Sequence, residues 1–324
     1  MSRLKRTGQL LLALLIAVAP LAAQKLPAPK RTPDGQPDIQ GVWSFATITP
    51  LERPAELAGK TFFTEKEAAD YENAFLQRNN RDRRDGPAEA DVSRAYNDFW
   101  WDSGTKVVPT RRTALIIDPP DGKIPALTPA AQKRAAERAE TRRLHPADGP
   151  ENRPLAERCL VWATAGPPIL PSAYNNNIRI VQGAGYVAIL NEMIHDVRII
   201  PLDNRPHLPQ NVRLWMGDSR GRWEGNTLVI DTTNFTDKTN FRGADENLHL
   251  IERFTRTGDN LLLYQFTVDN ETAFTRSWTA EVPMTKSESP MFEYACHEGN
   301  YSLLNVLAGA RAEEKGAADS KTAR

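Results

Sequence analysis

The chain has 324 residues with 41 basic and 41 acidic side chains, and 40% of its residues are hydrophobic. Removal of the predicted signal peptide takes away Arg3, Lys5 and Arg6, which leaves 38 basic against 41 acidic residues and a net charge of −3. Because no basic excess is available to displace counterions, the charge argues against nucleic acid as a partner. About 300 residues suffice for one large domain or two smaller ones, each with a core.

The N-terminus reads MSRLKRTGQLLLALLIAVAPLAAQ, a cationic start followed by an apolar run and small residues. This pattern predicts a secretory signal peptide over residues 1–23, cleaved near Ala23. The apolar run from Leu10 to Leu21 contains Pro20 and is too short to span a bilayer. No cysteine follows the small residues, which argues against a lipid anchor. We therefore expect a periplasmic or secreted protein with no stable membrane insertion after cleavage.

The two cysteines are Cys159 and Cys296. In an exported protein two cysteines usually pair, and a bridge closing a loop of roughly 140 residues stabilises the fold by about 4 to 5 kcal/mol. Two free or metal-bound thiols are the alternative. With five histidines, no HxH, no HExxH and no cysteine cluster, the sequence predicts no metal site. Motifs for serine hydrolysis, nucleotide hydrolysis and dinucleotide redox chemistry are also missing, so no cofactor is expected.

A Pro-rich leader over residues 24–37 precedes DIQGVWSFATI, whose alternation predicts a short strand. Apolar positions at helical spacing after Thr64 predict a helix over 64–80, with Thr64 as its N-cap. The Arg- and Asp-rich piece over residues 78–91 mixes both signs of charge and is typical of a solvated loop. Farther on, ALIIDPPDGKIPAL predicts a strand ending in a Pro/Gly turn. A second helix then begins with Thr128 as N-cap and Pro129 at its first position.

After Asn175 the pattern changes to short alternating or apolar runs rich in β-branched residues, separated by turn-like pieces. The predicted strands are IRIVQ, YVAILNE, DVRIIPL, VRLWMG, TLVIDTTNF, LHLIERFTR, LLLYQFTVD, TRSWTAEV and FEYAC, with GAG, HD, DSRGRWEGN and TGDN among the connectors. No long helical period lies between them, which excludes parallel strands with crossover helices. An up-and-down sheet of about nine strands tends to close on itself, because closure removes its edges.

Gly41–Trp43 in the first predicted strand is similar to the Gly-x-Trp that opens lipocalin-like barrels, where the Trp closes one end. We expect a mainly β protein, an antiparallel lipocalin-like (calycin-type) barrel with a helical N-terminal elaboration. Its parts are 38–160 for the first strand and elaboration, 161–309 for the barrel, and 310–324 for a disordered tail. Lipocalins usually have a short hairpin where this chain has about 130 residues. Either this stretch decorates the barrel, or the first strand lies outside it.

Four longer pieces resemble a family of uncharacterised exported bacterial proteins, common in soil bacteria such as acidobacteria. They are EMIHDVRIIPLDNRPHLP, WMGDSRGRWEGNTLVIDTTNF, LHLIERFTR and FEYACHEGNY. The resemblance covers most of the chain after Pro33. The resemblance implies export, and it names no reaction that can be carried over to this chain.

The densest of these pieces, Trp215 to Phe235, is interpreted as a turn region. Glu224, Gly225 and Asn226 form a plausible hairpin turn. Asp218 is expected to accept backbone N–H bonds within its own turn, and Trp215 and Trp223 are expected to stack at one end of the barrel.

Candidate catalytic groups lie in several strands. In a hairpin around Ile194 to Asp196, Glu192 and Arg198 would oppose each other with His195 at the tip, which suits proton transfer beside an anion. A surface ion pair with an exposed histidine is the alternative. Strand parity places His249 and Glu252 on opposite faces, with Glu252 as the inward acid. The full set of candidate catalytic residues is Glu192, His195, Arg198, Asp231, Glu252 and His297.

The favoured hypothesis is an exported barrel that binds a small, largely apolar or aromatic molecule in its interior or mouth. The alternative is a cofactor-independent hydratase, lyase or isomerase that uses a carboxylate and a histidine. A structural envelope protein is a third class, and no oligomeric state is predicted. The expected ligand-binding residues are Trp43, Trp215, Trp223, Tyr264, Trp278 and Tyr301.

Overall fold

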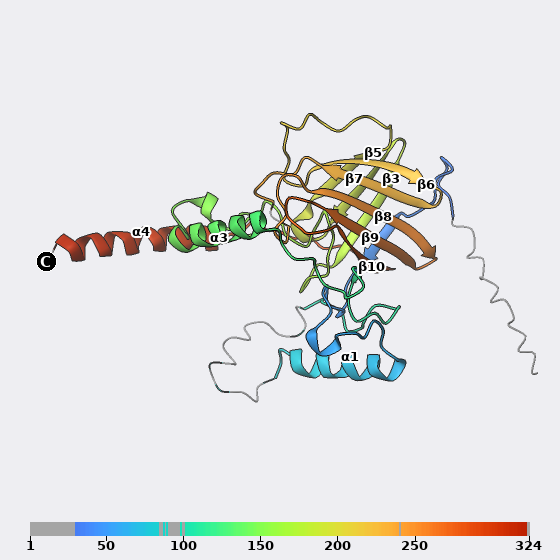
Figure 1. Cartoon of the computed structure of the whole chain (residues 1–324), viewed down its shortest axis with the longest axis horizontal. Helices are drawn as coiled ribbons and strands as arrows, with labels where there is room; N and C mark the ends of the chain where they lie inside the picture. Colours follow the sequence, from blue (N-terminus) through green and yellow to red (C-terminus); the bar gives the residue numbers. More distant parts are fainter. Residues whose placement is uncertain are drawn as a thin grey trace, which may run out of the picture.

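The computed structural model describes residues 30–83, 87, 89, 98, 101–239 and 241–322. The predicted signal peptide and part of the Arg/Asp-rich piece lie outside these residues. Nine antiparallel strands form a nearly closed barrel in the spatial order β5-β4-β3-β1-β10-β9-β8-β7-β6, and β2 pairs with β10 off this path (Figure 1). The strands are β1 (Gly41–Ser44), β2 (Ile116–Asp118), β3 (Asn177–Gly183), β4 (Tyr186–Asn191), β5 (Val197–Pro201), β6 (Asp218–Glu224), β7 (Thr227–Thr233), β8 (His249–Gly258), β9 (Leu261–Asp269) and β10 (Trp278–Lys286). The expected lipocalin-like antiparallel barrel is confirmed.

The first strand belongs to the barrel. β1 pairs with β3 on one side and with β10 on the other, with Trp43 opposite Ile178 and Lys286. Trp43 is fully buried, and its Nε1–H donates to the carbonyl oxygen of Ile39 at 2.9 Å. The long stretch after β1 therefore decorates the barrel, since the strand before it and the strands after it share one sheet.

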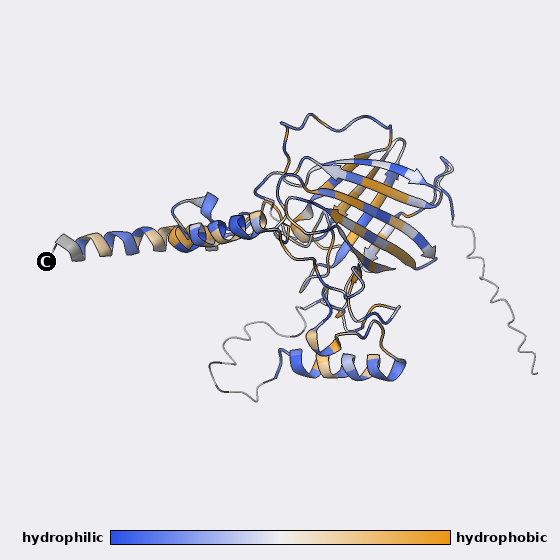
Figure 2. Cartoon of the chain, viewed as in Figure 1, coloured by the Kyte–Doolittle hydropathy of each residue, from blue (hydrophilic) through white to orange (hydrophobic). Residues whose placement is uncertain are grey.

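The barrel interior is filled by its own side chains. Burial alternates along the strands, as in β9, where every second residue is buried, and Figure 2 shows the matching alternation of apolar and polar positions. The largest fully buried side chains of the barrel strands and their connections are aromatic: Trp43, Trp278, Tyr264, Phe235, Phe254, Phe266 and Phe274. Ring pairs such as Phe254 with Tyr264 at 4.6 Å and Phe266 with Trp278 at 5.7 Å add specific contacts.

Side chains close the barrel between β5 and β6, which form no ladder with each other. Gly221 in β6 allows this approach, because a Cβ at that position would lie 2.6 Å from Leu202 Cδ2 and 2.9 Å from Ile200 Cγ2. Arg198 of β5 also donates to the Ser219 hydroxyl of β6 at 3.1 Å. The seam is thus held by packing and by one side-chain bond.

Three α-helices lie in the described part of the chain: α1 (Glu65–Asn79), α3 (Pro129–Leu144) and α4 (Tyr301–Thr322), with short 3-10 turns at η1 (Ala55–Leu57), η3 (Pro150–Asn152) and η4 (Met193–His195). Both predicted N-caps are confirmed, since the Thr64 and Thr128 hydroxyls accept from the backbone N–H groups three residues later. Packing of α1 builds a small satellite core around Phe63, below the barrel in Figure 1, and α3 and α4 project from the barrel. No helix among the described residues is long and apolar enough to cross a membrane.

Four expectations about elements need correction. Residues 212–217 are not a strand, and residues 218–224, expected as a connector, form β6. The hairpin turn expected around Gly225 is confirmed, because Gly225 with φ +61° reverses the chain beside Asn226. Residues 292–296 form no strand. The tail expected to be disordered is helical up to Thr322 as part of α4.

Candidate functional site

A polar network lies inside the barrel, and we call Arg198, Glu252 and Tyr264 the inner network. Glu252 is fully buried on β8, opposite Ile230 of β7, as its strand parity predicted. The Arg198 guanidinium donates from Nη1 and Nη2 to the two Glu252 oxygens at 3.1 and 2.5 Å. The Tyr264 hydroxyl donates to Glu252 Oε1 at 2.8 Å and accepts from the backbone N–H of Ile169 at 3.0 Å.

The Tyr264 hydroxyl of the inner network favours its protonated form. Burial, together with the neighbouring Glu252 carboxylate, raises the pKa of the Tyr264 hydroxyl well above its usual value. The Glu252 carboxylate accepts two hydrogen bonds from the Arg198 guanidinium and one from the Tyr264 phenol, so both of its oxygens have partners. These contacts link side chains of β5, β8 and β9 inside the barrel, so the inner network has a structural role.

A second polar group lies on the outward face of the barrel, and we call Asp218, His207, Asp231 and His249 the outer cluster. His249 Nε2 lies 3.1 and 3.0 Å from the two oxygens of Asp231. His207 Nε2 lies 3.1 Å from Asp231 Oδ1, and its Nδ1 lies 3.0 Å from Asp218 Oδ2. The four side chains form a continuous chain of carboxylates and imidazoles across β6, β7, β8 and the connection before β6.

Solvent still reaches the outer cluster, because the side chains of His207, Asp231 and His249 are 29%, 29% and 35% exposed. The hydrogen bond from His249 lowers the pKa of the Asp231 carboxyl, and the neighbouring charges of both imidazoles act in the same direction. The bond to Asp231 likewise raises the pKa of His249. The outer cluster therefore holds an ionised acid beside a histidine that favours its protonated form.

Residues 202–217, which connect β5 to β6, cross the outer face of the barrel, and we call them the strap. Asn234 at the end of β7 anchors it, since its Nδ2 lies 3.0 Å from each of the carbonyl oxygens of Leu208, Pro209 and Val212. The Leu208 N–H donates to Asp218 Oδ2 at 2.9 Å. Asp218 thus holds the strap, and the expectation that it closes its own turn is wrong.

The strap ends at an apolar cavity of about 220 Å³, outside the barrel interior. Trp162, Trp215 and Phe241 supply its aromatic wall, and Lys238 is the charged residue of its lining. Phe241 stacks on the core residue Trp278 with ring centroids 6.1 Å apart. Other lining residues are Pro154, Leu155, Ala156, Val161, Ala163, Gly166, Pro167 and Thr239.

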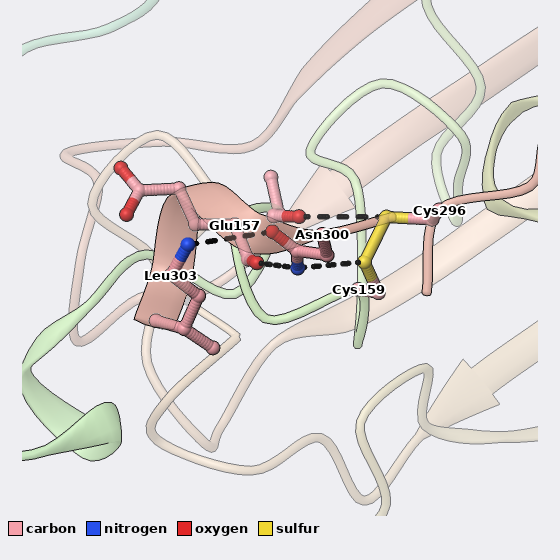
Figure 3. Close-up of a disulfide and its surroundings, with 6 residues drawn as sticks. Glu157, Cys159, Cys296, Asn300 and Leu303 are labelled. Atoms are coloured by element: carbon pink, nitrogen blue, oxygen red, sulfur yellow. Dashed lines mark hydrogen bonds between the residues drawn. A yellow bond between two sulfur atoms is a disulfide. The ribbon is translucent and has the colours of Figure 1, made fainter. Parts of the chain in front are cut away.

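The disulfide between Cys159 and Cys296 fixes the loop that forms one wall of this cavity, and the predicted pairing is confirmed with an S–S distance of 2.10 Å. Figure 3 shows Asn300 beside the bridge, where its Nδ2 lies 2.8 Å from the carbonyl oxygen of Glu157 and 3.5 Å from Cys159 Sγ. The start of α4 is thereby tied to residues 156–159. The disulfide, which joins two residues far apart in the sequence, therefore positions this wall of the cavity.

The expected pair of Glu192 and Arg198 is not formed. Register places Arg198 opposite Ile189, so its side chain points inward to Glu252. Glu192 is buried at the end of the barrel, where it accepts from Asn177 Nδ2 at 2.7 Å and from the Phe292 N–H at 3.1 Å. The side chain of His195 lies outside the described part of the structure. His297 is exposed beside the disulfide and joins none of the groups above.

The six expected ligand-binding residues separate into three environments. Trp43, Tyr264 and Trp278 are fully buried core residues. Tyr301 is 71% exposed at the start of α4. Trp215 and Trp223 line two different cavities, so the expected stacking between them is not observed.

The sequence interpretation missed His207 and the pairing of His249 with Asp231. The alternation of buried and exposed positions could have indicated this pair, since it places Asp231 and His249 on the outward face of neighbouring strands. No group of three or more His, Cys, Asp or Glu residues in the described part of the chain is arranged to hold a metal ion. Comparison of the chain with protein-family models and with curated proteins finds no match.

Proposed function

We propose that this is an exported protein that binds a small, largely apolar or aromatic molecule in the cavity beside Trp215. The observation that carries the proposal is the cavity itself, which three aromatic side chains, Trp162, Trp215 and Phe241, help to line outside the filled barrel core. Aromatic walls with few polar groups are typical of small-molecule sites. The ligand therefore sits at the end of the barrel and not within it.

The size and charge of the cavity narrow the ligand class. Its volume of about 220 Å³ is below the roughly 300 to 1,000 Å³ of pockets for drug-sized ligands. A molecule with a single ring fits this space. Lys238 offers an exposed ammonium group beside the aromatic wall, which favours a ring that carries a carboxylate.

Binding of single-ring compounds tests the proposal. Isothermal titration of the oxidised protein with benzoate, benzyl alcohol and cyclohexanecarboxylate should give the tightest binding for benzoate, with a dissociation constant on the order of 0.1 mM. Trp215→Ala and Trp162→Ala should each weaken benzoate binding at least fivefold. Trp223→Ala, which alters a different cavity, is the matched control and should bind like the wild type. Absence of saturable binding for all three compounds would overturn the proposal.

Export rests on the signal-like N-terminus, the disulfide and the resemblance to exported bacterial proteins, and we place the mature protein in the periplasm or outside the cell. Cell fractionation with mass analysis of the N-terminus tests this. Cleavage near Ala23 in an extracytoplasmic fraction is expected, and an uncleaved cytoplasmic chain would contradict it.

A second candidate function is cofactor-independent acid–base catalysis, favoured by the hydrogen bond between Asp231 and His249. A partly exposed carboxylate beside an imidazole can move a proton to or from a substrate carbon next to a carbonyl. Nuclear magnetic resonance in D₂O tests it by deuterium exchange into small keto and unsaturated acids. Exchange that is lost in Asp231→Asn supports this function, and exchange that no tested acid undergoes, or that survives the substitution, rules it out.

A further inference from the structure

A second cavity, of about 340 Å³, lies where α1 approaches the barrel, and we call it the α1 cavity. It shares no lining residue with the cavity beside Trp215. Phe75 of α1 and two residues of the barrel core, Leu115 and Leu170, give it an apolar surface. Its volume falls within the roughly 300 to 1,000 Å³ of small-molecule pockets. The α1 cavity therefore has the size and the surface to hold the hydrocarbon part of a ligand.

The space available to a ligand is elongated. A neighbouring cavity of about 300 Å³ shares Phe75, Ser103 and Ser172 with the α1 cavity. The two spaces therefore adjoin at these three side chains. An extended chain can use both spaces, whereas a single ring fills only part of one.

Arg242 gives the α1 cavity its charge. Among the described residues of the lining it is the only charged one. No ion pair or hydrogen bond joins its guanidinium to another described residue, whereas two arginines of β6 pair with Asp218 and Glu224. An unpaired guanidinium presents parallel N–H donors that match the two oxygens of a carboxylate. A single cation in an otherwise uncharged lining balances one negative charge, so the site suits a monoanion.

The turn that carries Arg242 is fixed at both ends. Phe241 and Ala244 are buried, and the Ala244 N–H donates to the Phe241 carbonyl oxygen at 2.9 Å. Arg242 lies at the tip with φ +54°, followed by Gly243 with φ +104°. A left-handed backbone is unfavourable for a residue with a side chain, and it persists where the surrounding structure imposes it. The buried ends of the turn thus set the backbone from which the Arg242 side chain reaches the cavity.

Two serine hydroxyls in the same lining add hydrogen-bond donors. The fully buried Asn176 holds their segments together, because its Nδ2 donates to the carbonyl oxygens of Asp102 at 2.5 Å and Ser172 at 3.0 Å. Its Oδ1 accepts from the Ser172 N–H at 2.7 Å. Ser103 directly follows Asp102. The hydroxyls of Ser103 and Ser172 have no hydrogen-bond partner among the described residues, so both can donate to an anion.

We propose that the α1 cavity is a second binding site, for a small linear aliphatic carboxylate. The carboxylate pairs with Arg242 and accepts from the hydroxyls of Ser103 and Ser172, and the hydrocarbon chain packs on Phe75 and Leu170. This site does not rest on the function proposed for the cavity beside Trp215. Because the two cavities share no lining residue, the two can be tested apart.

Methyl resonances locate the bound molecule in the oxidised wild type. Leu170 reports on the α1 cavity and Val161 on the cavity beside Trp215, with both signals assigned by single substitutions. Hexanoate at pH 7 should move the Leu170 resonances along a saturable curve, with a dissociation constant on the order of 1 mM. The neutral analogue 1-hexanol should bind there about fivefold more weakly, because it cannot pair with the guanidinium. Unmoved Leu170 resonances, or equal affinity for the two compounds, would overturn the proposal.

Substitutions test the polar groups in the same titration. Arg242→Gln should weaken hexanoate binding about fivefold, and the double variant Ser103→Ala with Ser172→Ala about twofold. Arg179→Gln is the matched control, because it removes the same charge from an exposed position on the outer face of β3, and it should bind like the wild type. Arg242→Lys keeps the charge and should recover part of the loss.

The outcomes separate the two sites. Unchanged hexanoate affinity in folded Arg242→Gln overturns the proposal. A saturable shift of Val161 without one of Leu170 also overturns it, by assigning hexanoate to the cavity beside Trp215. A Leu170 shift that depends on Arg242, in a protein that does not bind benzoate, upholds the α1 cavity and refutes the function proposed for the cavity beside Trp215.

Discussion

The two faces of β7 and β8 carry acids with opposite roles. Glu252 points inward and is fully buried with a guanidinium and a phenol, whereas Asp231 points outward and is shared by two imidazoles that water can reach. The inner acid is bonded to a guanidinium and a phenol, whereas the outer acid is bonded to imidazoles, and its bond to His249 raises the pKa of that histidine. Burial and partner chemistry, more than residue type, thus separate an acid that fixes structure from one that responds to protons.

Breaking the inner ion pair should have the largest effect. Glu252→Leu leaves the Arg198 guanidinium buried without a counter-charge, so the free energy of unfolding should fall by about 3 to 5 kcal/mol. Urea unfolding at pH 7 measures this. The double variant Arg198→Met with Glu252→Leu is the control and should recover most of the loss, because it removes both charges. A single variant that loses less than about 1 kcal/mol would show that the pair is not buried as described.

A smaller loss is expected from removing one hydroxyl of the inner network. Tyr264→Phe leaves the Ile169 N–H without its acceptor and Glu252 with one donor fewer. The free energy of unfolding should fall by about 1 to 3 kcal/mol, measured in the same urea experiment. Phe254→Leu, a change of shape at a fully buried neighbour without a polar group, shows how much of that loss comes from packing alone. Equal stability of Tyr264→Phe and the wild type would contradict the network.

The outer pair should affect stability less and in a pH-dependent way. The lowered pKa of Asp231 stabilises the fold above the unfolded value near 3.9 and is lost as the pH falls. The raised pKa of His249 stabilises the fold below the unfolded value near 6.5 and is lost as the pH rises through its folded value. The pair therefore contributes most between about pH 4 and pH 6.5, and solvent screening limits it to about 1 kcal/mol or less. Asp231→Asn should flatten this part of the stability profile, and an unchanged profile contradicts the assignment.

The smallest effect is expected at a histidine outside both groups. His145 and Asp148 are about half exposed, so His145→Gln should change the free energy of unfolding by less than about 0.5 kcal/mol at any pH. A larger change would mean that exposed ion pairs also stabilise this fold. Exposure would then not explain the difference between the buried Glu252 pair and the outer cluster. Thermal unfolding at pH 5.5 and pH 8.5 is sufficient to measure it.

Local pattern was sufficient to predict the barrel and the inward position of Glu252. Alternation and turn residues identify β3, β4, β5, β7, β8, β9 and β10, because each strand buries one face. The same logic failed for residues 212–224. There the apolar piece VRLWMG lies in the strap, whereas DSRGRWEG, rich in polar residues and glycine, forms β6. Pairing with β7 and the role of Gly221 at the seam decide that strand, and neither is visible in a single segment.

The candidate site was less predictable, because its members meet through register and through the path of the strap. The residue of β8 directly opposite Asp231 is Ile251. His249 lies two residues before Ile251 and is therefore diagonally across from Asp231. Placing the two side chains together requires the alignment of β7 with β8. His207 reaches them from an irregular segment, whose course depends on the three carbonyl contacts of Asn234. Parity gives the face of each strand residue, but it cannot position a residue that lies in a loop.

The placement of β1 between β3 and β10 sets an order of assembly. Trp43 pairs across the sheet with Lys286, so this contact joins two ends of the sequence and gives the fold a high contact order. At a synthesis rate of about 5 to 20 residues per second, β1 waits roughly 10 to 50 s for β10 to be made. Until then the β1 edge has no partner on that side, and the barrel cannot close.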